Sequence, residues 1–168
     1  IGVQLVDRQD VYAVNGGGLM INPNGPAAKR RACDVNDISL NLRDGEALIT
    51  ANDPRAPAAR DNTPLTLTFS NPVRGVGAFI AVGGPDVLPD LTLLGVMWLR
   101  EAGGSWSHFV ASGKTGGVRS PQASRIPPPL SGAVATGSER IAEVRFDATF
   151  MGNRRFKFLA LSSLYGAL

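Results

Sequence analysis

The sequence predicts an all-β protein, an antiparallel β-sandwich with a jelly-roll-like arrangement of strands. Short stretches in which apolar and polar residues alternate recur along the chain. Glycine (20 residues) and proline (12 residues) separate these stretches, as is typical of strands joined by tight turns. No window with apolar residues at helical spacing is longer than two turns. Because helices are too few to connect parallel strands, we expect antiparallel sheets packed face to face.

The first half of the chain contains several expected strands separated by turn residues. Asn15 is followed by three glycines, and Asp44-Gly45 suits a hairpin turn. Asn71-Pro72 follows the clearest alternation in the chain, Leu65 to Phe69, and is expected to end it. Pro26 to Arg31 fit a short helical turn, because proline suits the first position of a helix. The strands are expected at residues 2–6, 18–21, 38–42, 46–50, 65–69 and 74–82.

The second half contains four expected strands, at residues 91–100, 106–110, 140–146 and 156–161. The first of these is long and apolar, which predicts a central strand covered on both faces. Gly103-Gly104 supplies the turn that follows it. Long loops are expected at residues 51–64 and at 113–137, the second containing Pro127-Pro128-Pro129. Neither loop resembles an interdomain linker, so residues 1–168 are expected to form one domain.

Charge and cysteine content exclude several classes of protein. Charged residues make up 18% of the chain, below the roughly 25% usual for soluble domains. The net charge is +3, but the basic residues are dispersed, with Arg30-Arg31 and Arg154-Arg155 as the local pairs. Nucleic-acid binding needs a concentrated basic stripe, so we expect no nucleic-acid partner. No apolar run reaches the ~20 residues of a membrane span. The single cysteine, Cys33, excludes a disulfide framework and is expected to be buried.

The run LTLTFSNPVRGVGAFIAV, residues 65–82, resembles a segment of bacterial exported domains of the kind found in PEP-CTERM-sorted proteins. The later runs LTLLGVMWLREAGGSWSHFVASG, ERIAEVRF and FKFLALSSLYG follow the order of that family, so the resemblance covers residues 38–166. It implies a sandwich similar to carbohydrate-binding-module jelly rolls, and a bacterial protein that is secreted, periplasmic or on the cell surface. Ser162 and Ser163 stand where the family usually carries an acidic residue.

The two ends of the chain bear on the expectation that the protein is exported. The chain begins with Ile1, so we expect a processed or trimmed form from which any signal peptide has been removed. No sorting anchor follows the closing strand before Leu168. We therefore expect that the anchor has been removed, or that the protein is released or assembles by another route.

Trp106 and His108 are the first candidate ligand-binding residues. They alternate along one expected strand and therefore share a face with Val110. An aromatic ring beside an imidazole suits a sugar, whose C–H face packs on the ring while its hydroxyls meet polar groups. Trp98, the other tryptophan, is the third candidate. The alternative interpretation is that Trp106 caps the core and His108 is an ordinary edge residue.

Asp34, Asn36 and Asp37 form an oxygen-rich cluster before residue 38, and calcium prefers oxygen ligands. A structural calcium ion is the one cofactor for which the sequence offers ligands. The glycine and distal glutamate of a calcium loop do not follow, so an Asx turn is the alternative.

The sequence does not assemble a catalytic centre. His108 is the only histidine, and no Gly-x-Ser-x-Gly motif accompanies it. Cys33 and His108 do not form a recognisable dyad, and no pair of facing carboxylates can be assigned among the four glutamates. We therefore expect a protein that is not an enzyme.

Two functions fit these observations. The first is a non-catalytic extracellular or cell-surface binding module, with carbohydrate or envelope polysaccharide as its ligand. The alternative is a structural or assembly subunit of a surface layer, filament or larger complex, because edge strands can pair with a neighbouring chain.

Overall fold

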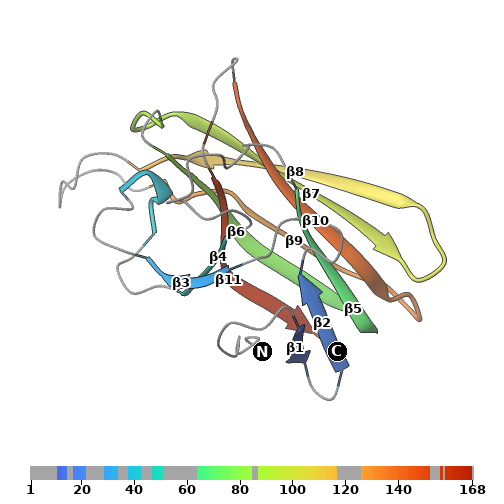
Figure 1. Ribbon diagram of the computed structural model, residues 1–168. Coiled ribbons are helices and arrows are strands. Elements are labelled where there is room, and N and C mark those ends of the chain that lie inside the picture. Colours follow the sequence, from blue (N-terminus) through green and yellow to red (C-terminus); the bar gives the residue numbers. More distant parts are fainter. Residues whose placement is uncertain are drawn as a thin grey trace.

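The computed structural model describes residues 11–14, 17–21, 29–33, 38–42, 47–50, 64–84, 87–116, 126–151, 156 and 158–167. The elements in these residues are strands, apart from one short 3-10 helix, η1 (Ile38–Leu40). The strands form two antiparallel sheets (Figure 1). The six-stranded sheet has the order β1-β2-β5-β10-β7-β8, and the five-stranded sheet has the order β3-β4-β11-β6-β9.

The strands of the six-stranded sheet are β1 (Val11–Val14), β2 (Gly17–Ile21), β5 (Leu65–Val73), β7 (Thr92–Glu101), β8 (Trp106–Lys114) and β10 (Ile141–Phe150). Those of the five-stranded sheet are β3 (Lys29–Ala32), β4 (Ala47–Thr50), β6 (Gly75–Gly83), β9 (Leu130–Val134) and β11 (Phe158–Ala167).

Strands β4 to β11 pair as nested hairpins. The innermost pair is β7 with β8, followed outward by β6 with β9, β5 with β10, and β4 with β11. Successive pairs lie alternately in the six-stranded and the five-stranded sheet. This alternation is the strand order of a jelly roll, so the predicted fold class is confirmed.

The core lies between the two sheets. In β5, β7 and β10 buried residues alternate with more exposed ones, as expected for strands that give one face to a core. Leu67, Met97 and Phe146 of the six-stranded sheet are fully buried and belong to the same cluster as Ile80 and Leu161 of the five-stranded sheet. Burial of these apolar side chains provides the main stabilising free energy.

The outer face of the five-stranded sheet carries a second apolar cluster. Its members are Cys33, Leu40, Leu48, Ala81, Phe158 and Ala160. Leu40 comes from η1, so the segment around that helix covers this sheet. Cys33 is buried, as expected. The cover explains why β6 is buried on both faces.

The expected strand at residues 38–42 is wrong. Ile38–Leu40 form η1, and Asn41 has a φ of 57°. This φ lies in the left-handed region, which Asn tolerates but an extended strand does not contain. The amide of Asn41 donates hydrogen bonds to the carbonyls of Lys114 (3.3 Å) and Ile126 (2.6 Å). The apolar alternation here reflects Leu40 and Leu42 packing on the sheet from a turn.

Two further expectations, one about a strand end and one about a helical turn, are wrong. Asn71-Pro72 does not end its strand, because β5 continues to Val73. The β5–β10 register shifts there, from Glu143 opposite Thr68 to Ile141 opposite Val73. Pro72 therefore lies in a bulge, where the missing N–H breaks no hydrogen bond of that ladder. The helical turn expected up to residue 31 is also wrong for residues 29–31, which belong to β3.

The loop expected at 113–137 contains two stretches of strand. β8 continues to Lys114, and β9 occupies Leu130–Val134. The three prolines between them connect the sheets, since Lys114 N–H donates to Pro127 O (3.2 Å) and Ile80 N–H to Pro129 O (2.8 Å). The expected strand at residues 2–6, the Asp44-Gly45 turn and residues 51–63 of the other expected loop lie outside the described residues.

We predict that Gly113→Ala destabilises the protein by about 2 kcal/mol, the usual scale of overpacking. A Cβ at residue 113 would come within 2.5 Å of Pro129 N and 2.6 Å of Pro127 O. Both are backbone atoms of a segment that is held by hydrogen bonds to the carbonyls of Pro127 and Pro129. Urea denaturation measures the change. The control Ser112→Ala, at an exposed position of the same strand, should change stability by less than about 0.5 kcal/mol. Equal stability of both variants would show that the contact with the prolines is not rigid.

Candidate functional site

The outer face of the six-stranded sheet gathers aromatic and charged side chains from three neighbouring strands. On β7 the core-facing residues are Leu93, Gly95, Met97 and Leu99, so Trp98 and Arg100 face outward. The register aligns Trp106 of β8, Arg100 of β7 and Glu143 of β10 in one row across the sheet. The adjacent row aligns His108, Trp98 and Arg145. The sheet therefore brings all three predicted ligand-binding residues to one face.

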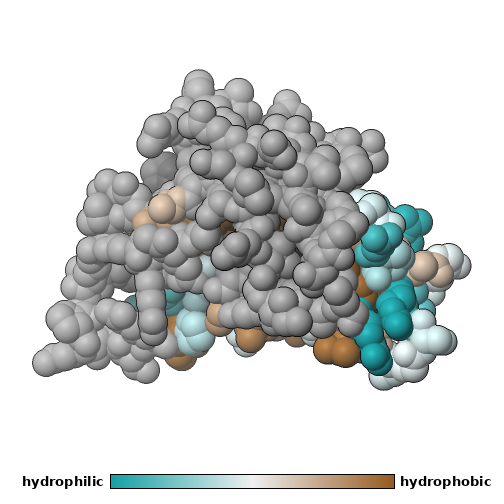
Figure 2. All heavy atoms as spheres, turned by 90° about the horizontal axis from the view of Figure 1, so that it is seen from below, coloured by the Kyte–Doolittle hydropathy of each residue, from teal (hydrophilic) through white to brown (hydrophobic). Residues whose placement is uncertain are grey.

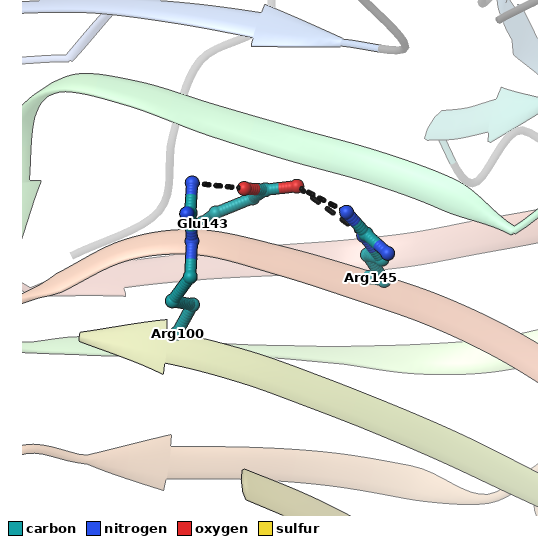
Figure 3. Close-up of polar contacts among 3 residues, drawn as sticks. All are labelled: Arg100, Glu143 and Arg145. Carbon is teal, nitrogen blue, oxygen red and sulfur yellow. Dashed lines mark hydrogen bonds and ion pairs between the residues drawn. The ribbon is translucent and has the colours of Figure 1, made fainter. Parts of the chain in front are cut away.

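Glu143 lies between two arginines (Figure 3). Arg100 Nη2 donates to Glu143 Oε2 at 2.6 Å. Arg145 donates to the other oxygen, Oε1, from Nε at 3.2 Å and from Nη2 at 3.0 Å. Both carboxylate oxygens are therefore engaged. A carboxylate with little access to water needs such partners, because burying it unpaired costs several kcal/mol.

The guanidinium groups of Arg100 and Arg145 both lie over the ring of Trp106. Arg145 Cζ is 4.2 Å from the ring centroid, and Arg100 Cζ is 5.5 Å from it. Both distances fall within the ~6 Å over which a cation is attracted to the face of an indole. Glu143 and Trp106 thus both contact the two arginines, and the four side chains form one cluster. We call Arg100, Trp106, Glu143 and Arg145 the Trp106 cluster.

Exposure differs sharply within the Trp106 cluster. The side chains of Arg100 and Arg145 are 46% and 45% exposed, whereas that of Glu143 is 11% exposed. Trp106 is 37% exposed. The negative charge is thus nearly covered while the positive charges and the ring reach the surface. Hydrophilic residues gather on the right of Figure 2, the side on which the β7–β8 and β9–β10 turns lie in Figure 1.

The β7–β8 turn places Arg100 opposite Trp106. Gly104 N–H donates to Glu101 O at 3.0 Å and closes a four-residue turn. Gly103 has a φ of 77°, which glycine adopts without the penalty of a Cβ. This agrees with the turn expected at Gly103-Gly104.

The sequence predicted the shared face of Trp106 and His108 but not the arginines and the carboxylate beside them. The interpretation in which Trp106 caps the core is wrong, because Trp106 points away from it. Glu143 was not among the predicted site residues. Alternation along 140–146 places Glu143 and Arg145 on one face, but pairing of β10 with β7 was needed to bring Arg100 to them.

The expected calcium ligands Asp34, Asn36 and Asp37 lie outside the described residues. Within the described ranges, no three His, Cys, Asp or Glu side chains are grouped so that they could hold a metal ion. In that same part of the chain no helix is long and apolar enough to cross a membrane.

Asp147 lies farther along the same face, opposite Val96 of β7. Its side chain is half-buried, and Oδ1 accepts a hydrogen bond from the N–H of Ala148 at 2.7 Å. Burial raises the pKa of Asp147 above its ordinary value, and the hydrogen bond from Ala148 opposes that effect. The folded protein therefore binds this proton more tightly than the unfolded chain does.

We predict that Asp147→Asn raises the melting temperature at pH 7. The raised pKa means that the wild type loses stability as pH rises from the ordinary Asp value, 3.8, through the folded value. The Asp147→Asn variant does not lose this stability. The difference in melting temperature between the two proteins should therefore disappear at pH values below the ordinary Asp pKa. Thermal unfolding followed by circular dichroism from pH 3 to pH 8 measures it. Glu139→Gln, at an exposed position, is the control. A lower melting temperature of Asp147→Asn at pH 7 would contradict the account.

Comparison of the chain with models of protein families, with curated proteins and with solved structures found no match.

Proposed function

We propose that this protein is a non-catalytic binding module of the bacterial cell surface or extracellular space, with carbohydrate or envelope polysaccharide as its ligand. The observation that carries the proposal is the partly exposed Trp106 ring on the outer face of the six-stranded sheet, bordered by two guanidinium groups. The resemblance of residues 38–166 to exported bacterial domains supports the location.

The outer face combines the two kinds of contact that a sugar needs. An indole offers a flat apolar surface to the C–H bonds of a sugar ring. The guanidinium groups offer fixed N–H donors to hydroxyl oxygens. The cluster is held by Glu143, so little conformational entropy is lost when a ligand binds. Trp98 and His108, in the next row, extend the same face along the strands.

The arrangement of the carboxylates on this face supports binding without catalysis. Both oxygens of Glu143 accept hydrogen bonds from arginine. Asp147 lies four residues farther along β10, which corresponds to about 13 Å in a strand. Glycoside hydrolysis uses two carboxyl groups about 5 to 9.5 Å apart. Glu143 and Asp147 therefore do not form such a pair.

A structural or assembly role is the second candidate, and the edge strands favour it. β8 and β9 are edges of their sheets. Val110 of β8 is 57% exposed and Val134 of β9 is 73% exposed. Long edge strands with exposed apolar residues can pair with strands of another chain.

We predict that Trp106→Ala lowers affinity for a bound glycan at least tenfold, because truncating an aromatic anchor costs about 2 kcal/mol or more. A glycan array identifies the ligand, and isothermal titration calorimetry measures the loss. Trp106→Phe keeps a ring and should retain part of the affinity. Phe109→Ala, on the opposite face of β8, is the control for altered strand packing.

Two results would decide against the binding module. One is glycan binding that Trp106→Ala leaves unchanged, since the site would then lie elsewhere. The other is a protein that binds no glycan and sediments as a large assembly, which would favour the structural role.

A further inference from the structure

We propose that the Trp106 cluster recognises an acidic saccharide, with a uronate carboxylate on the guanidinium groups and the sugar ring against Trp106. The inference rests on the proposed function and specifies its ligand class. It follows from the distribution of charge within the cluster, the donors that the cluster leaves open, and the position of the ring.

The exposed part of the cluster is positively charged. Two guanidinium groups surround one carboxylate, so the four side chains carry a net charge of +1. The two arginine side chains are almost half-exposed, while the side chain of Glu143 is nearly covered. An approaching ligand therefore meets the positive charges first, and a negative group is favoured over a neutral one.

The arginines retain donors after binding Glu143. Arg145 uses Nε and Nη2, and Arg100 uses Nη2. Nη1 of both side chains, and Nε of Arg100, make no hydrogen bond with a described residue. A guanidinium carries five N–H donors in a planar fork that matches a carboxylate. Glu143 thus orients each fork and leaves part of it open.

Trp106 places an apolar surface next to these donors. Its ring centroid lies 4.2 Å from Arg145 Cζ. A uronic acid carries its carboxylate on the sugar ring, so charge and C–H face are presented within one monosaccharide. The juxtaposition of an exposed indole and two partly free guanidinium groups fits this combination. A neutral sugar would use the ring and leave the net positive charge of the Trp106 cluster without a counter-charge.

The test compares polygalacturonate with its fully methyl-esterified form, which keeps the sugar backbone and lacks the charge. Affinity electrophoresis and isothermal titration calorimetry are performed at 20 mM and 300 mM NaCl. We expect the acid form to bind at least tenfold more tightly than the ester at low salt. The advantage should shrink at high salt, because exposed charges are screened. Alginate and hyaluronan extend the test to other uronic acids.

Variants test whether a preference for the acid form arises from the Trp106 cluster. Arg145→Gln and Arg100→Gln should each reduce binding of the acid form by about tenfold and leave binding of the ester nearly unchanged. Arg145→Lys keeps the charge and loses the planar fork, so it should recover only part of the affinity. Arg74→Gln removes an exposed arginine from the β5–β6 connection and serves as the matched control for net charge. Circular dichroism confirms that each variant is folded.

The outcomes separate this inference from the proposed function. Equal binding of the acid and ester forms, or binding of neutral glycans alone, would overturn the acidic ligand and leave the binding module intact. A preference for the acid form that Arg74→Gln reduces as much as Arg145→Gln does would show nonspecific attraction and also overturn the inference. Failure to bind any acidic or neutral glycan would overturn both proposals.

Discussion

The packing of two sheets against one core is the constraint on which the rest of the structure depends. Side chains of a strand alternate between its faces, so a strand that gives one set of residues to the core must present the other set outside. In β7 the core receives Leu93, Met97 and Leu99, and the outer face receives Trp98 and Arg100. A shift of one residue in register would exchange the two sets and bury an arginine.

The two outer faces are used differently. That of the five-stranded sheet is covered by the segment around η1, with Leu40 and Cys33 packed on β6 and β11. That of the six-stranded sheet carries charged residues, two tryptophans and a histidine on β7, β8 and β10. The cover on the five-stranded sheet increases the apolar surface that this protein buries.

The sequence predicted the fold class because alternation is a local property that each strand displays by itself. It predicted the common face of Trp106 and His108 for the same reason. The Trp106 cluster depends on residues 100, 106 and 143, and the pairing that brings β10 beside β7 joins segments about forty residues apart. No local pattern specifies that pairing. β9 escaped prediction because Leu130–Val134 is rich in small residues and follows three prolines. η1 escaped it because apolar residues at every second position also suit a turn that covers a sheet.

The central claim is that positively charged groups surround an exposed tryptophan on the outer face of the six-stranded sheet. Quenching of tryptophan fluorescence by iodide and by caesium tests this most directly and needs no ligand. Trp98→Phe leaves Trp106 as the single tryptophan. Relative to free N-acetyltryptophanamide at low salt, iodide should then quench Trp106 several-fold more efficiently than caesium, because the guanidinium groups attract the anion. Arg145→Gln should reduce that difference. Equal quenching by the two ions, or stronger quenching by caesium, would contradict the account.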